Sequence, residues 1–85
     1  MSLNVTVVAA DRSVWSGDAE RVVARTVEGE IGILTGHEPV LAIVAGGNVR
    51  ITPTSGETIN VSADGGFLSV ADDVVHVVAD QAKLV

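Results

Sequence analysis

Apolar and polar residues alternate along most of the chain, and the apolar positions are rich in β-branched side chains. The alternation is clear in LNVTV (3–7) and recurs in GNVRITP (47–53), ETINVSA (57–63) and DVVHVVAD (73–80). Successive side chains of a strand point to opposite faces, so a period of two is typical of strands that bury one face. We therefore predict a half-buried strand in each of these segments.

Turn-forming residues separate the apolar runs at short intervals. These clusters lie at residues 16–18, 46–48, 53–56, 64–66 and 72–73. No segment keeps a helical period over ten residues. PVLAIVAGG (39–47) is ambiguous, and we assign it to a strand because Ile43 and Val44 are β-branched and glycines follow at once. Many short strands joined by tight turns favour an all-β, antiparallel sandwich or barrel. The chain ends at ADQAKLV (79–85), directly after the last predicted strand.

Composition agrees with one small folded unit. The chain has 85 residues, of which 47% are hydrophobic and only 2% aromatic. This content suits a packed aliphatic core rather than disorder. No linker or repeat interrupts it, so we predict a single β-sandwich domain over residues 1–85. Trp15, which precedes the predicted turn at 16–18, is interpreted as a core or rim anchor, or as an interface residue.

Charge and cysteine content exclude several classes of function. The formal net charge is −6, and the five basic residues form no run, so the footprint needed for nucleic-acid or anionic-lipid binding is missing. There is no cysteine, which excludes disulfides, thiolate metal sites and cysteine nucleophiles. No apolar run approaches the roughly 20 residues of a membrane-spanning helix. We expect membrane association only through other proteins.

The candidate catalytic and metal-binding residues favour a non-catalytic protein without a cofactor. His37 and Glu38 are adjacent, so in an extended segment they point to opposite sides and do not share a metal easily. Glu28 and Glu30 would share a strand face, but Gly29 between them indicates a turn or bulge. The acidic pair at 72–73 lacks the spacing of a calcium loop. We predict neither a catalytic residue nor a metal site.

The segment EGEIGILTGHEPVLA (28–42) carries a family resemblance. It is similar to the signature of the epsilon subunit of bacterial F-type ATP synthase, in which acidic residues, glycines, a Gly-His pair and a proline recur in fixed order. The matching positions are Glu28, Gly29, Glu30, Ile31, Gly32, Ile33, Gly36, His37, Pro39 and Leu41. VWSGDAERVVARTVEG (14–29) and VSADGGFLSVADDVVHVVAD (61–80) also resemble the family in the right order. The likeness therefore extends over almost the whole chain.

The resemblance implies a fold and a role. The fold is a β-sandwich of about ten strands. The role is that of a non-catalytic subunit of the central rotor, which joins the gamma subunit to the c-ring and couples proton-driven rotation to ATP synthesis. It implies a peripheral location on the cytoplasmic face of the bacterial plasma membrane.

The resemblance also implies which residues meet the partners. Glu30, Ile31 and Gly32 belong to the edge that faces the c-ring loops, and His37 belongs to the region near gamma and the ring. The full set of expected interface residues is Glu28, Glu30, Ile31, Gly32, Gly36 and His37. Typical family members continue into two C-terminal helices, and ADQAKLV does not supply them. We therefore do not expect inhibition or ATP binding by such helices.

Two other interpretations of the chain are compatible with the same strand pattern. One is a generic β-sandwich module that binds a ligand or a protein, against which stand the missing secretion signal and the few aromatic residues. The other is a biotinyl or lipoyl carrier domain, which needs a lysine at a hairpin tip. The only lysine, Lys83, lies beside the C-terminus.

Overall fold

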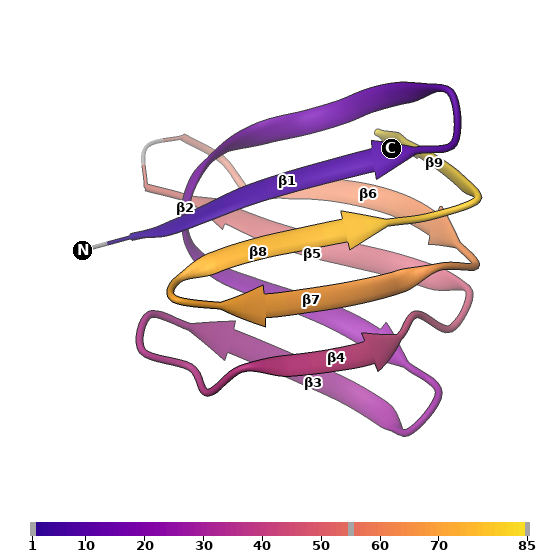
Figure 1. Cartoon of the computed structure of the whole chain (residues 1–85). Coiled ribbons are helices and arrows are strands. Elements are labelled where there is room, and N and C mark those ends of the chain that lie inside the picture. Colours follow the sequence, from indigo (N-terminus) through magenta and orange to yellow (C-terminus); the bar gives the residue numbers. More distant parts are fainter. Residues whose placement is uncertain (1, 55, 85) are drawn as a thin grey trace.

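The chain folds as strands, without a helix among the residues described. The computed structural model describes residues 2–54 and 56–84 (Figure 1). The nine strands are β1 Leu3–Ala9, β2 Arg12–Thr26, β3 Gly29–Leu34, β4 Val40–Ile43, β5 Gly47–Pro53, β6 Ile59–Asp64, β7 Phe67–Ala71, β8 Val74–Val78 and β9 Gln81–Leu84. The all-β prediction is confirmed, and 39–47 does contain a strand, β4.

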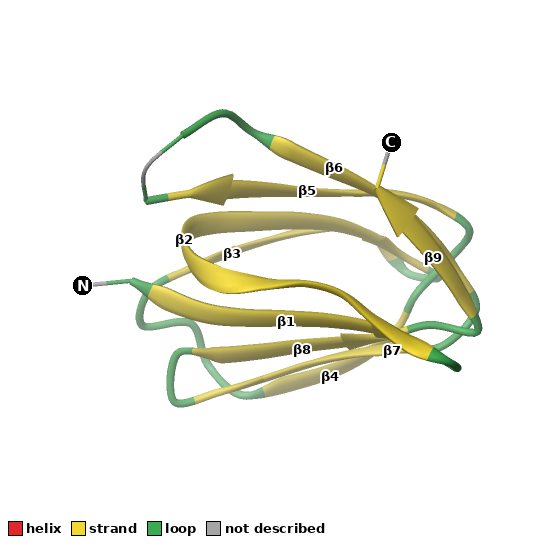
Figure 2. Ribbon diagram, turned by 90° about the horizontal axis from the view of Figure 1, so that it is seen from above, coloured by secondary structure: helices red, strands yellow, loops and turns green. Residues whose placement is uncertain are grey.

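One continuous series of paired strands folds back on itself to form the two layers of a sandwich. Its order is β4-β7-β8-β1-β2-β5-β6-β9, and β3 adds to β2. The 15-residue strand β2 belongs to both layers: residues 12–19 pair with β1, and residues 19–26 pair with β3 and β5. Layer one therefore contains β4, β7, β8 and β1, and layer two contains β3, β5, β6 and β9 (Figure 2).

Two details of the strand pattern differ from the sequence-based prediction. The turn expected at 16–18 is wrong, because Gly17 and Asp18 lie within β2, opposite Val5 and Asn4 of β1. The chain also forms β9 after the last predicted strand, paired with β6. One pair, β1 with β8, is parallel, and every other pair is antiparallel. Because β2 does not break, we find nine strands in the described residues where about ten were expected.

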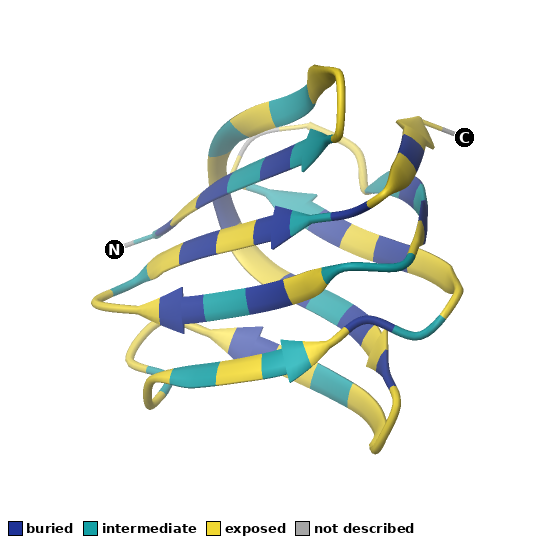
Figure 3. Ribbon diagram, turned by 45° about the vertical axis from the view of Figure 1, so that its right-hand side comes forward, coloured by how far each residue is buried: buried dark blue, intermediate teal, exposed yellow. Residues whose placement is uncertain are grey.

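The core lies between the two layers and is aliphatic, as predicted. Alternate residues of most strands are buried, which gives the banded pattern of Figure 3, whereas β4 has no fully buried residue. The fully buried large side chains are Leu3, Ile33, Ile51, Leu68, Val5, Val7, Val22, Val49, Val61, Val70, Val75 and Val77. Trp15 is half-buried in β2 and packs against this core. Its indole ring lies over Gly17, where an added Cβ would be 3.1 Å from two ring carbons.

Tight turns confirm the turns that were predicted at residues 64–66 and 72–73. Gly65 and Gly66 join β6 to β7 with positive φ angles of 71° and 105°. Asp72 and Asp73 join β7 to β8 with φ angles of 50° and 61°. Gly56 has a φ of 110°, as the predicted turn at 53–56 requires, although Ser55 lies outside the described residues. These turns place the strand ends, and with them the candidate site.

Candidate functional site

Three of the six predicted interface residues lie at a groove between β3 and β4. The groove has a volume of about 420 Å³ and is lined by residues 26–31 and 40–43, which include Glu28, Glu30 and Ile31. In the part of the chain that the structure describes, β3 forms a ladder only with β2 and β4 only with β7. The two walls of the groove meet at one end, where the Val27 N–H donates to the carbonyl oxygen of Ile43 at 3.0 Å. Leu41 and Ile43 of β4 are 73% and 61% exposed there. The groove thus combines an acidic rim with exposed apolar side chains and open strand edges.

Gly36 and His37 lie at the other end of β3, beside the turn between β7 and β8 (Figure 1). The backbone N–H of Gly36 donates to Asp73 Oδ1 at 2.7 Å. The His37 ring places Nδ1 2.7 Å from the carbonyl oxygen of Glu38, which assigns the donor role to Nδ1–H. The predicted residues are therefore brought together in two groups rather than in one site.

The three glycines of the signature differ in what the fold demands. Gly29 and Gly36 have φ angles of 122° and 84°, which favour glycine over any side chain. Gly32 lies within β3 opposite Val23, and an added Cβ would meet no atom within 4 Å. The fold therefore explains two of these glycines and leaves the third without an internal reason.

The hydrogen bond from Gly36 to Asp73 can be tested with a matched pair of variants. We expect Asp73→Ala to lower the free energy of unfolding by about 1 kcal/mol more than Asp72→Ala, since only Asp73 accepts this bond. Both aspartates have positive φ, so the strain from alanine is similar in the two variants. Urea unfolding measures the difference, and equal losses would contradict the role of Asp73.

The outer side of layer one carries an apolar row, which was not predicted. Strand pairing places Ile43, Phe67, Val78 and Val8 side by side across β4, β7, β8 and β1. Phe67 is 42% exposed, and none of these side chains belongs to the buried core. We call this row, together with the outward-facing Leu41 and Val74, the apolar face. Contiguous exposed apolar surface of this kind marks interaction sites.

His76 lies within the apolar face rather than in a metal site. It is opposite Ser69 of β7 and Thr6 of β1, and it is exposed. Among the described residues, no group of three or more histidine, cysteine or acidic side chains could hold a metal ion. DVVHVVAD did contain a signal for this face, because β8 has valines on both of its sides.

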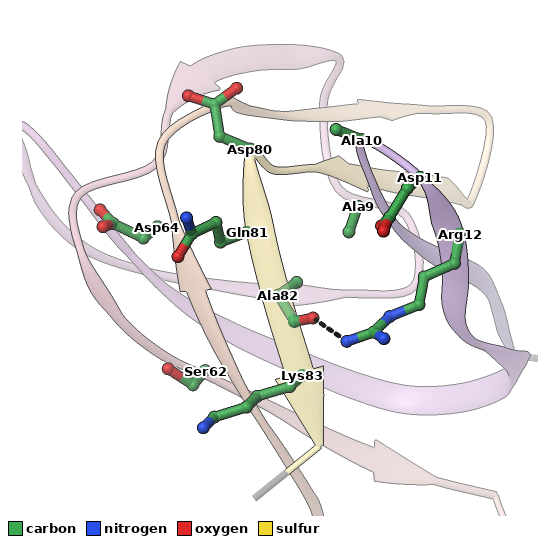
Figure 4. A pocket seen from close by; sticks show the side chains of 10 residues that line it. All are labelled: Ala9, Ala10, Asp11, Arg12, Ser62, Asp64, Asp80, Gln81, Ala82 and Lys83. Carbon is green, nitrogen blue, oxygen red and sulfur yellow. Dashed lines mark hydrogen bonds between the residues drawn. The ribbon is translucent and has the colours of Figure 1, made fainter.

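Another depression lies away from all of the predicted residues. It has a volume of about 640 Å³ and is formed by the turn between β1 and β2, the end of β6, and β9 (Figure 4). Arg12 Nη2 donates to the carbonyl oxygen of Ala82 at 3.4 Å and so connects β2 to β9. Asp11, Asp64 and Asp80 also line it, but they do not form a metal-binding group in the described structure. We assign it no role.

Sequence comparison identifies the family. The family described as ATP synthase, delta/epsilon chain, β-sandwich domain matches residues 2–85. An ATP synthase epsilon chain of Micrococcus luteus is 51% identical over 82 residues, which are 96% of this chain and 90% of that protein. The epsilon chain of Frankia casuarinae is 48% identical, and the match covers 99% of both proteins. For the epsilon chain of Streptomyces griseus, at 49% identity, this chain spans only 66% of its length.

Solved structures agree with the sequence comparison. A chain in the cryo-EM structure of the Euglena gracilis mitochondrial ATP synthase, OSCP/F1/c-ring, superposes with a TM-score of 0.90 at 27% identity. The match covers 98% of this chain and 53% of that one. A chain of the Tetrahymena thermophila central stalk and c-ring shares the fold, with a TM-score of 0.81 at 19% identity. None of the described residues forms a helix long and apolar enough to cross a membrane. The chain belongs to the family of ATP synthase delta/epsilon chains, and its residues 2–85 correspond to the β-sandwich domain of that family.

Proposed function

We propose that the chain is a non-catalytic rotor subunit of an F-type ATP synthase, which joins the gamma subunit to the c-ring. In this role it transmits proton-driven rotation of the ring to gamma, and so to ATP synthesis elsewhere in the complex. The family assignment supports this proposal, as does the similarity to chains of ATP synthase assemblies. The observation that carries it is the presence, on one sandwich, of two adjoining partner-type surfaces that share Leu41 and Ile43 of β4. These are the acidic-rimmed groove and the apolar face.

The groove between β3 and β4 and the adjoining edge of β3 are proposed to meet the c-ring. Glu28 and Glu30 are exposed at its rim, where their carboxylates are available to cationic or hydrogen-bonding groups of ring loops. Gly32 follows on the same strand and has open space around it. A glycine in such a place lets a partner backbone approach closely. This combination suits polar loops that contact a strand edge.

The apolar face is proposed to meet gamma. An obligate interface needs an apolar centre with a polar rim, and the row from Ile43 to Val8 supplies such a centre. His37 follows Gly36, which is hydrogen-bonded to Asp73 in the turn between β7 and β8, so it lies beside the Val74 end of the apolar face. Its place there suits contact with gamma, the ring or both.

The proposed location follows from these partners. The chain would lie at the cytoplasmic face of the bacterial plasma membrane and be held there by the complex rather than by insertion. A sandwich whose layers share β2 suits this position, because torque between two surfaces must pass through a body that resists shear.

Glu30→Lys tests the ring contact. We expect the variant to bind the c-ring about tenfold more weakly, because the charge at the rim is reversed. Its thermal midpoint should fall by only a few degrees, because Glu30 is exposed and the new lysine meets one like charge, that of Arg25, in solvent. Ring binding and thermal unfolding are measured on the same preparation.

Glu57→Lys is the matched control, because Glu57 is also exposed but lies in the segment between β5 and β6. Ring binding of this control should stay within twofold of the unchanged chain. If Glu30→Lys binds normally, or loses binding only because it unfolds, the groove is not the ring contact.

A further inference from the structure

Basic residues that form no run along the sequence are brought together by the fold on the strands of layer two, which the sequence analysis did not predict. Four of the five basic residues lie on its strands, namely Arg21, Arg25, Arg50 and Lys83. Strand pairing places Arg21 opposite Thr52 and Arg50 opposite both Val23 and Asn60. The outward positions in the middle of this layer's outer face carry no carboxylate, since residues 48, 50 and 52 of β5 and 60 and 62 of β6 are Asn, Arg, Thr, Asn and Ser. Neither proposed partner surface includes the centre of this face.

A depression of about 310 Å³ lies at the centre of the face. It is lined by Arg21, Val23, Arg50, Thr52 and Thr58. These residues bring two guanidinium groups and two hydroxyl groups to one concavity, on strands β2 and β5 and at the start of β6. Val23 supplies the apolar part of the floor.

The two arginines of the depression are unneutralised neighbours. Arg21 and Arg50 occupy diagonal positions on paired strands, where Cα atoms are about 7–8 Å apart, and like charges at such positions repel. Neither guanidinium makes a hydrogen bond or an ion pair with another described side chain. Arg25 differs from them in its cross-strand neighbour, because the acidic residue Glu30 lies opposite it on β3.

We propose that this depression binds a phosphate group, either free or carried by a phosphomonoester or a lipid headgroup. A guanidinium presents paired N–H donors that match two phosphate oxygens, and hydroxyl groups donate to the remaining ones. A tetrahedral anion can accept from two arginines that line one depression, whereas a planar carboxylate fills only part of such a donor set. An anion between Arg21 and Arg50 also removes their repulsion. The proposal does not rest on the rotor function.

The direct test is a titration of the ¹⁵N-labelled full chain with sodium phosphate at constant ionic strength. We expect saturable shifts in the amide resonances of residues 21–23, 50–52 and 58. Binding should raise the thermal midpoint, because a ligand that binds only the folded state stabilises it. Arg50→Gln should weaken phosphate binding at least tenfold and abolish this rise. The substitution is at an exposed side chain, so the fold should be retained.

Arg25→Gln is the matched control, since it removes the same charge from the same face but lies outside the depression. Its affinity for phosphate should stay within twofold of that of the wild-type chain. A second arm replaces phosphate with vesicles containing phosphatidic acid. Saturation by vesicles alone, lost in Arg50→Gln, would identify a lipid headgroup as the source of the phosphate group. Failure of both probes, equal effects of the two variants, or the same shifts with acetate would overturn the proposal.

Discussion

Replacing Gly66 by alanine is expected to remove most of the stability of the fold at room temperature. The residue has a φ of 105°, a backbone conformation that side chains rarely adopt. An added Cβ would overlap the carbonyl oxygen of Val78 and lie 2.7 Å from the Cα of Ala79. Both obstacles are backbone atoms, so relief requires movement of the strand ends. Strain and overpacking together cost on the order of 4 kcal/mol, which is most of the stability of a small domain.

The neighbouring glycine provides the control for this experiment. An added Cβ at Gly65 would come within 2.6 Å of the Asp80 carboxylate, which is the mobile end of a side chain and can move away. Its φ of 71° is left-handed helical, so alanine there costs only about 1–2 kcal/mol. Urea unfolding followed by far-UV circular dichroism measures both variants. Equal stabilities of Gly65→Ala and Gly66→Ala would show that the overlap at Gly66 is relieved without cost.

Phe67→Ala is expected to weaken binding to gamma by about 100-fold while leaving the fold intact. Phe67 is in the middle of the apolar face, between Ile43 and Val78, and it is the only aromatic residue there. When a central aromatic residue buried in an interface is replaced by alanine, the binding free energy falls by roughly 2–4 kcal/mol. In the free chain its side chain is 42% exposed, so its truncation to alanine removes little packing from the folded domain. Calorimetric titration with gamma measures the change.

Leu84→Ala is the control for this variant. Leu84 is also a large exposed apolar residue, at 53%, but it lies on β9 in layer two. It should bind gamma as the unchanged chain does, and thermal unfolding should show both variants folded. An unaltered affinity of Phe67→Ala would remove the apolar face from the gamma interface.

Much of the fold was predictable from the sequence because burial follows a period of two. Val5, Val49 and Val75 each lie at a position that alternation assigns to the inside, and each is buried. The errors arose where distant parts of the chain decide the structure. Gly17 and Asp18 favour a turn locally, but pairing with β1 keeps them in β2.

The last strand was missed for a related reason. β9 buries only Ala82, so its local apolar pattern is weak, and its conformation depends on pairing with β6. The candidate site was predictable only in part. The signature residues were found by family resemblance, whereas the groove requires β3 and β4 to face each other, which no local pattern reveals. The apolar face was missed because alternation in 73–80 was used to assign one buried side, although Val74 and Val78 lie on the other.

The continuity of β2 has a consequence for how the chain opens. In most sandwiches the two layers are joined by loops, so one layer can fray while the other persists. Here the same 15-residue strand supplies hydrogen bonds to both layers. Separating the strands of one layer therefore removes hydrogen-bond partners from the other layer. We therefore expect the core amides of both layers that pair with β2 to exchange with solvent together, at a free energy close to that of global unfolding.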